Sequence, residues 1–326
     1  MRAVVCRAWG PPESLVVEDV PEPTPGPNDV LIRVRACGVN FADALIVQGK
    51  YQEKPPLPFT PGLEVAGEIV AMGEDVTGFA TGQRVAALCA TGGYAETVTA
   101  PSTVTVQIPD TMPYETAAGF MVAYGTAHVG LEYRAGLCEG ETLLVHGAAG
   151  GVGLAAVEVG KAMGATVIAT AGSQDKRALA SAHGADHVID YRAGEFKDIV
   201  KMLTDDRGAD VVFDPVGGSV LAQSMRCIAW EGRLLVIGFA AGDIPQVPAG
   251  LVLVKNISMI GVYWGAYRMH DPAVITGSLR RLFAWFEEGA LRPMISETLP
   301  LERAAQAMQR LLGRVAQGKI VLTTAV

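Results

Sequence analysis

TLLVHGAAGGVGLAAVEVGKAMGATVIAT (residues 142–170) contains, in order, an apolar strand, a glycine-rich turn, a helix and a second apolar strand. Gly150 and Gly151 allow the backbone to approach a pyrophosphate closely, and Gly153 allows the helix to pack against the strand. The first turn of the helix, which includes Val152, offers free N–H groups and a partial positive charge to the phosphates. This order of elements predicts a dinucleotide-binding unit.

Three further apolar strands follow this unit, and a helix-like stretch precedes each of them. They read HVIDY (187–191), DVVFDPVGG (210–218) and RLLVIGF (233–239). Apolar strands that alternate with helices predict a parallel sheet covered on both faces, which is the doubly wound α/β arrangement of a Rossmann domain.

The first 120 residues have a different texture, with short strands separated by proline and glycine. Candidate strands are VLIRVRACGV (30–39), GEIVAMG (67–73) and QRVAAL (83–88), and this spacing favours a small β-barrel. The C-terminal stretch KIVLTTAV is a further strand, which we expect to return to the barrel. We therefore predict a substrate domain over 1–121 and 266–326, and a cofactor domain over 122–265.

Composition excludes several functional classes. The chain has 326 residues, of which 50% are hydrophobic, and a formal net charge of −8, which argues against a surface for nucleic acids or anionic membranes. It contains no apolar run long enough to span a membrane and does not begin like a signal peptide. The five cysteines form no C-x-x-C pair, so we expect neither a zinc lobe nor disulfides, and a cytoplasmic location.

The end of the second strand predicts the choice of dinucleotide. NAD sites usually place an acid there to bind the ribose hydroxyls, whereas TVIAT is followed by Ala171, Gly172 and Ser173. Lys176 comes one helical turn later and could bind a 2′-phosphate, with Arg177 as a second cation. Ser173 could also be the N-cap of the next helix, which is compatible with phosphate binding. The sequence therefore favours NADPH.

Several segments resemble the medium-chain dehydrogenase/reductase family, and specifically its zinc-lacking quinone oxidoreductase branch, the relatives of zeta-crystallin. These segments are ACGVNFAD (36–43), PGLEVAGEI (61–69), GAAGGVG (147–153), FDPVGG (213–218) and VIGFAAG (236–242). The resemblance implies that the β domain is a GroES-like barrel. Zinc enzymes of this family read G-V-C-H-T-D and G-H-E at the first two places. Asn40 and Leu63 occupy the positions of the zinc-binding cysteine and histidine, so we expect no metal.

The resemblance also implies roles for individual residues. Asn40 and Tyr51 would be the polar groups nearest the substrate, and Thr126 would meet the nicotinamide, although His128 replaces a tyrosine of the family there. Further cofactor contacts would come from Tyr191 at the 2′-phosphate and from Ile237, Gly238 and Phe239 at the carboxamide. For Tyr51, packing in a loop is the alternative to a role at the site. Tyr263 and Trp264 are weaker candidates for the wall of the substrate site.

These features together predict an NADPH-dependent reductase of quinones or related conjugated carbonyls, with a small-molecule substrate and no nucleic-acid or membrane partner. One alternative is an enoyl reductase acting on an acyl thioester or enone, which shares the Gln-Gly-x-Tyr segment found at 48–51. Another is a non-catalytic NADPH-binding protein with a structural or nucleic-acid-binding role. The apolar, β-rich stretch NISMIGVYWG (256–265) predicts an edge strand through which two copies form a homodimer.

Overall fold

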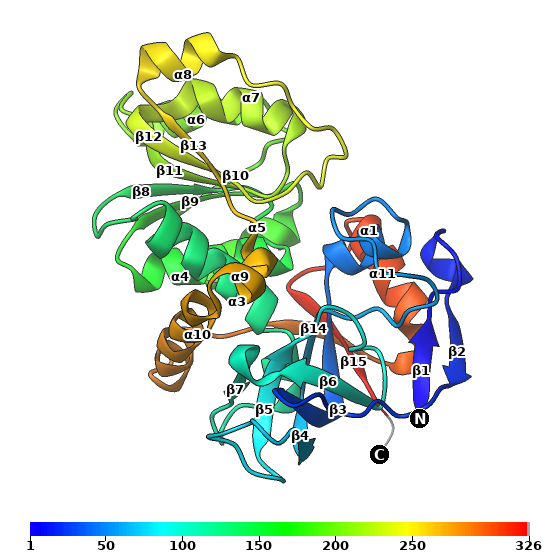
Figure 1. Ribbon diagram of the computed structural model, residues 1–326. Coiled ribbons are helices and arrows are strands. Elements are labelled where there is room, and N and C mark those ends of the chain that lie inside the picture. The colour runs from blue at the N-terminus through cyan, green and yellow to red at the C-terminus, as the bar shows by residue number, and fades with distance from the viewer. Residues whose placement is uncertain (325–326) are drawn as a thin grey trace. The chain divides into compact units, whose positions relative to one another are not determined.

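The computed structural model describes residues 1–324, which form two compact units (Figure 1). The first unit, which we call the barrel unit, contains Met1–Val122, Arg268–Phe283 and the chain from Pro293 onward. The second, the cofactor unit, contains Ala123–Tyr267 and Ala284–Arg292. Residues 284–292, which the sequence analysis places in the substrate domain, thus group with the cofactor unit.

The barrel unit is built on a curved, mainly antiparallel sheet. Its strands are β3 (Asp29–Val39), β4 (Glu64–Met72), β5 (Arg84–Leu88), β6 (Thr97–Pro101), β7 (Thr105–Gln107), β14 (Ile295–Pro300) and β15 (Lys319–Thr323). Their order is β14-β15-β3-β4-β5-β7, and β6 pairs with β3 as well. A separate hairpin joins β1 (Arg2–Val5) to β2 (Val16–Asp19). Branched side chains such as Ile32, Val65 and Ile69 fill the core of the barrel unit.

The C-terminal strand returns to the barrel unit, as predicted. β15 pairs antiparallel with β3, and Ile320 lies opposite Val39. This register places Lys319, the first residue of β15, beside the point where β3 ends and the chain turns at Asn40.

The helices of the barrel unit pack against its sheet and against one another. They are α1 (Phe41–Val47), α2 (Tyr114–Ala118) and α11 (Ala304–Leu312), with short 3-10 turns at Pro12–Ser14, Ser102–Val104 and Leu301–Arg303. The long helix α10 (Pro272–Glu287) begins in this unit and ends in the cofactor unit.

The cofactor unit contains a six-stranded parallel sheet with the order β10-β9-β8-β11-β12-β13. The strands are β8 (Thr142–Val145), β9 (Thr166–Thr170), β10 (His187–Ile189), β11 (Ala209–Asp214), β12 (Ile228–Val236) and β13 (Ser258–Gly261). Helices α4 (Gly151–Ala162) and α5 (Gln174–Ala182) cover one face, and α6 (Phe196–Leu203) and α7 (Gly218–Cys227) cover the other (Figure 1). This confirms the doubly wound arrangement.

The remaining helices of the cofactor unit lie outside these two layers of crossover helices. They are α3 (Met121–His128), whose first two residues still belong to the barrel unit and which continues as a π-helix over Val129–Arg134, α8 (Ala249–Lys255) and a 3-10 turn at Trp264–Ala266. The short helix α9 (Tyr267–His270) begins at the last residue of this segment and belongs mostly to the barrel unit. Within residues 1–324, no helix combines the length and the apolar character needed to cross a bilayer.

Candidate functional site: a dinucleotide turn and a buried polar network

The glycine turn has the backbone geometry that the sequence predicts. Gly147 adopts a φ of 59°, and the chain then enters α4 with an extended backbone at Gly150. A Cβ atom at Gly153 would lie 2.2 Å from the carbonyl oxygen of Gly147, so only glycine fits at that position. Gly151 and Val152 are partly exposed at the start of the helix. Their N–H groups therefore remain available for an anion such as a pyrophosphate.

A buried histidine precedes this turn and fixes it to the sheet. The imidazole of His146 lies 2.9 Å from Thr170 Oγ1 and 2.8 Å from Ser224 Oγ, on β9 and α7. Burial lowers the pKa of His146 to about 4, so the ring is neutral at physiological pH. The turn is thus attached to both neighbouring elements by neutral hydrogen bonds.

The end of β9 carries the residues predicted to recognise the 2′-phosphate. Ser173 is the N-cap of α5, and its Oγ accepts a hydrogen bond of 3.3 Å from the backbone N–H of Lys176. Tyr191 comes from the turn after β10 and is 44% exposed. Its hydroxyl lies over Gly172, only 2.6 Å from where a Cβ would stand. These residues therefore meet at the carboxyl ends of two neighbouring strands.

Arg192 is the residue that the sequence analysis missed at this position. Its Nε also lies over Gly172, 2.8 Å from the place of a Cβ. The pKa of Lys176 is lowered, first by burial and then by the positive charge of Arg192. Arg177, predicted as the second cation, instead pairs with Asp190 at 2.5 Å. Arg192 beside Gly172 and Lys176, whose charges act on each other, suit an anionic ligand near the end of β9. The position of Arg192 directly after Tyr191 was the available signal.

The residues predicted at the nicotinamide end come from two further segments. The sequence predicts a strand over 233–239, but β12 ends at Val236. Ile237, Gly238 and Phe239 instead form a partly exposed loop beyond its end. Thr126 is buried on α3. Gly130, one turn after Thr126, faces the side chain of Ile237, so the helix and this loop are neighbours.

Tyr263 and Trp264 differ in exposure. Trp264 is buried against α3, where a Cβ at Gly125 would lie 2.4 Å from its ring. Tyr263 is 39% exposed. Of this pair, the indole therefore packs in the core of the cofactor unit, and the phenol lies at its surface.

In the barrel unit, Asn40 belongs to a buried polar network. Lys319 Nζ donates to Asn40 Oδ1 and to Glu64 Oε1, both at 2.7 Å, and to the carbonyl of Val39 at 3.2 Å. Asn40 Nδ2 donates to Glu64 Oε1 at 2.9 Å and to the carbonyl oxygen of Gly38 at 3.4 Å. Sequence analysis did not predict the role of Lys319, because it lies 279 residues beyond Asn40.

Asp43 lies beside this network and completes a capping box at the start of α1. Its Oδ2 accepts hydrogen bonds from the backbone N–H of Asn40 at 2.7 Å and from the hydroxyl of Tyr94 at 3.1 Å. Within residues 1–324, Oδ1 has no hydrogen-bond partner. Burial raises the pKa of Asp43 to about 7 despite these donors and the charge of Lys319. The carboxyl group therefore titrates near neutral pH.

Tyr51 follows α1, after a tight turn in which Gly49 has a φ of 67°. Its side chain is partly buried and packs against the core of the barrel unit. Asn40 and Tyr51 are thus at the two ends of the same short helix.

The polar network does not fit a zinc ion. An ammonium group within 2.7 Å of Asn40 Oδ1 and Glu64 Oε1 already occupies these oxygens and repels a second cation. Leu63 supplies no ligand. In the described part of the chain, no three His, Cys, Asp or Glu side chains form a group that could hold a metal.

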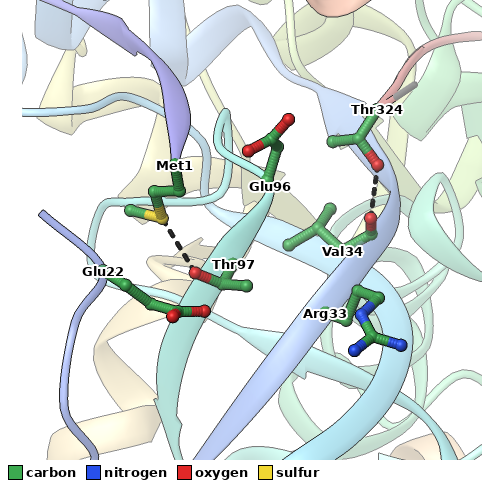
Figure 2. A pocket seen from close by; sticks show the side chains of 7 residues that line it. All are labelled: Met1, Glu22, Arg33, Val34, Glu96, Thr97 and Thr324. Carbon is green, nitrogen blue, oxygen red and sulfur yellow. Dashed lines mark hydrogen bonds between the residues drawn. The ribbon is translucent and has the colours of Figure 1, made fainter. Parts of the chain in front are cut away.

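A separate cavity of about 420 Å³ opens on the barrel unit (Figure 2). Its lining consists of Met1, Glu22, Arg33, Val34, Glu96, Thr97 and Thr324. The hydroxyl of Thr97 donates to the sulfur of Met1 at 2.8 Å. None of the residues predicted for the cofactor or the substrate lines it, so its chemistry is unrelated to theirs.

Comparison with known proteins identifies the family. Residues 26–110 match the family described as the alcohol dehydrogenase GroES-like domain, and residues 151–280 match the zinc-binding dehydrogenase family. Similar proteins include a quinone oxidoreductase-like protein 2 homolog of Nematostella vectensis, with 43% identity over 99% of this chain and 89% of the relative. Another is the human synaptic vesicle membrane protein VAT-1 homolog, with 34% identity over 99% of this chain and 86% of the relative.

The solved structures give the same result. Escherichia coli quinone oxidoreductase complexed with NADPH superimposes with a TM-score of 0.93 and 27% identity, over 99% of this chain and all of the other. The two folds of the units, a GroES-like barrel and a Rossmann-like sheet, are those of these relatives. The chain therefore belongs to the medium-chain dehydrogenase/reductase family, in the branch of the quinone oxidoreductases.

Proposed function

We propose that this protein transfers hydride from NADPH to quinones or related conjugated carbonyls without a metal ion. The observation that carries this proposal is the ammonium of Lys319 bound to Asn40 and Glu64, which leaves no place for zinc. Without a Lewis acid, the substrate itself must accept hydride readily. Quinones and α,β-unsaturated carbonyls do so because the negative charge spreads onto an oxygen.

Two features of the cofactor unit support NADPH as the reductant. The glycine turn presents the N–H groups of α4. Arg192 places a positive charge beside Gly172 and Tyr191, and this charge acts on the ammonium of Lys176. An anionic 2′-phosphate would relieve the repulsion between these cations, whereas the neutral ribose of NADH would not. The Escherichia coli relative is complexed with NADPH.

Asn40 and Tyr51 are the proposed donors to the substrate oxygen. The hydrogen bond from Asn40 Nδ2 to the carbonyl of Gly38 is long, at 3.4 Å, so a substrate oxygen could replace that acceptor. Hydride carries two electrons from NADPH to the acceptor, which leaves NADP⁺. The charged oxygen of the acceptor then takes a proton from water. Donors placed at this oxygen would stabilise the transition state.

The test is the rate of NADPH oxidation with a panel of acceptors: a benzoquinone, a naphthoquinone, an enone and an enoyl-thioester. We expect turnover with the quinones, at a rate that a metal chelator does not change. Preference for the thioester or enone would favour the enoyl-reductase alternative. Binding of NADPH without turnover of any acceptor would favour the non-catalytic alternative.

We also propose a homodimer formed through the edge of the parallel sheet. β13 is the last strand of that sheet, and the apolar helix α8, which precedes it in the chain, has no buried residue. Leu253 and Val254 on this helix are 78% and 65% exposed. A second copy would cover both features. A cytoplasmic location is also proposed, since all five cysteines are free thiols.

A further inference from the structure

Lys319 is a buried cation whose hydrogen-bonding capacity is fully used. Its side chain is 8% exposed, and the three acceptors of its ammonium are Val39 O, Asn40 Oδ1 and Glu64 Oε1. An ammonium has three donors, so each has one partner. A buried charge that is paired and fully hydrogen-bonded holds its neighbours in one arrangement.

This ammonium fixes the orientation of the Asn40 amide. Oδ1 faces Lys319, and Nδ2 faces Glu64 and the carbonyl oxygen of Gly38. A flipped amide would bring its NH₂ group against the ammonium and its oxygen against the carboxylate, so the network itself determines which atom is which. Of the two acceptors of Nδ2, Gly38 O at 3.4 Å is the weaker.

Glu64 is held equally firmly on the other side of the amide. Its Oε2 accepts a hydrogen bond of 2.8 Å from the backbone N–H of Val122, near the start of α3. A Cβ at residue 38 would lie 2.3 Å from Glu64 Oε1, so glycine is required there to admit the carboxylate. The amide, the carboxylate and the ammonium therefore form one preformed unit that joins β3, β4, β15 and α3.

We propose that Lys319 is a positioning residue for the reduction, acting through Asn40. It directs Nδ2 toward the side on which the substrate oxygen replaces Gly38 O. It also polarises the amide, because a charge-assisted bond at Oδ1 strengthens the N–H groups of Nδ2 as donors. This inference rests on the proposed function, since it assumes that Asn40 donates to the substrate.

A double-mutant cycle tests the kinetic part. The variants are Lys319→Met, Asn40→Ala and the two combined, assayed with NADPH and the best quinone of the panel. We expect Lys319→Met to lower kcat about tenfold, because the Asn40 amide remains but is no longer held in the orientation that donates to the substrate. The dissociation constant of NADPH should stay unchanged. In the Asn40→Ala background the same change should have almost no further effect, because the amide through which Lys319 acts is gone.

Two controls separate this role from general destabilisation. Lys319→Met leaves the Glu64 carboxylate buried without its cation, so the variant Lys319→Met with Glu64→Gln removes both charges together. This double variant should regain the melting temperature of the wild type, while its kcat stays low. Lys161→Met is a matched control, because it removes a lysine that pairs with Asp186 at 2.8 Å in the cofactor unit. We expect this control to keep the wild-type kcat.

A spectroscopic measurement tests the orientation independently of turnover. The chain has only three asparagines, Asn28, Asn40 and Asn256, so labelling with ¹⁵N-asparagine gives three side-chain amide pairs. In the wild type, the Asn40 pair should be well separated and slow to exchange with water. Lys319→Met should shift this pair and speed its exchange, and leave the other two pairs unchanged.

The outcomes are distinct. The positioning role would be overturned if the losses of kcat from Lys319→Met and Asn40→Ala were additive. It would also be overturned if Lys319→Met left the Asn40 amide signal unchanged. If the wild type reduces no acceptor, the proposed function fails, and the amide spectrum alone still decides whether Lys319 orients Asn40.

Discussion

At the scale of single residues, Arg192 lies beside Gly172, where we place the 2′-phosphate, and its charge lowers the pKa of Lys176. A hydrogen bond to a charged group contributes about 1.5–3 kcal/mol, and solvent exposure keeps the effect near the lower value. Lys176→Ala and Arg192→Ala should each raise the dissociation constant of NADPH roughly tenfold. NADH binding should barely change, since it lacks the phosphate.

Fluorescence titration of both cofactors measures these constants, and Arg177→Ala serves as the control. Arg177 is occupied by Asp190, so its removal should change the preference for NADPH much less than the other two changes. Equal weakening of NADH and NADPH by Lys176→Ala or Arg192→Ala would show that these residues support the fold or the pyrophosphate rather than the choice of cofactor.

Tyr51 provides the second prediction at this scale. Tyr51→Phe keeps the ring that packs against the barrel core and removes only the hydroxyl. If this hydroxyl donates to the substrate oxygen in the transition state, kcat should fall about tenfold, while NADPH binding stays the same. Steady-state kinetics with several acceptors measure the effect. Unchanged kinetics with all of them would assign Tyr51 to packing alone.

Asp43 makes stability depend on pH in an unusual direction. Burial raises the pKa of its carboxyl to about 7, so between its ordinary pKa of 3.8 and pH 7 the folded protein keeps a proton that the unfolded chain has lost. The contribution of Asp43 to the free energy of unfolding therefore falls as pH rises through this window, by roughly 4 kcal/mol at most.

Asp43→Asn mimics the protonated acid and should remove this dependence. Chemical denaturation of both proteins between pH 4 and pH 8 gives the difference in unfolding free energy. We expect the variant to gain stability relative to the wild type as pH rises toward 7. A difference that stays constant across the window would mean that Asp43 has an ordinary pKa.

At the scale of elements, the turn between β8 and α4 depends on the close contact between Gly153 and Gly147. A Cβ in Gly153→Ala would stand 2.2 Å from a backbone oxygen, so the turn must shift. Overpacking of this kind usually costs about 1–3 kcal/mol. We expect a lower melting temperature and much weaker NADPH binding.

Gly277→Ala is the matched control, because it makes the same substitution inside helix α10, where a Cβ meets nothing within 4 Å. Alanine is the better helix former by about 0.5–1 kcal/mol, so this variant should be slightly more stable and bind NADPH normally. Calorimetry and cofactor titration compare the two. Normal cofactor binding by Gly153→Ala would argue against a pyrophosphate at this turn.

At the scale of the whole molecule, the open edge at β13 and the exposed helix α8 predict the state of assembly. Light scattering at micromolar concentration should give twice the chain mass of 34.2 kDa. Leu253→Glu, at a side chain that is 78% exposed, should shift the protein toward monomer by burying a charge in the interface.

Met202→Glu is the control for this change. Met202 is also largely exposed, at 70%, but its helix α6 follows β10, the strand at the opposite end of the sheet from β13. It should leave the mass unchanged. A wild type with the mass of a monomer would contradict the proposed homodimer. Equal changes of mass in the two variants would indicate that any added charge disrupts the assembly.

The sequence by itself determined the fold class and the place of the cofactor turn. Strand, glycine turn and helix follow one another within residues 142–170, and each later strand is marked by its own short run of apolar residues. Such signals can be interpreted without long-range contacts. Ser173 as the N-cap of α5 and the returning strand β15 were also predicted correctly. The loop at Ile237–Phe239 was assigned to a strand, because apolar residues beyond β12 continue its pattern.

Only the tertiary structure decided which groups surround Asn40. Lys319, Glu64 and Asn40 lie far apart along the chain, and the antiparallel pairing of β15 with β3 brings them together. Arg192 was missed for a similar reason, because its side chain reaches Gly172 across two neighbouring strand ends. Local patterns specify elements, whereas a polar network depends on the register in which distant strands pair, and a single sequence does not show that register.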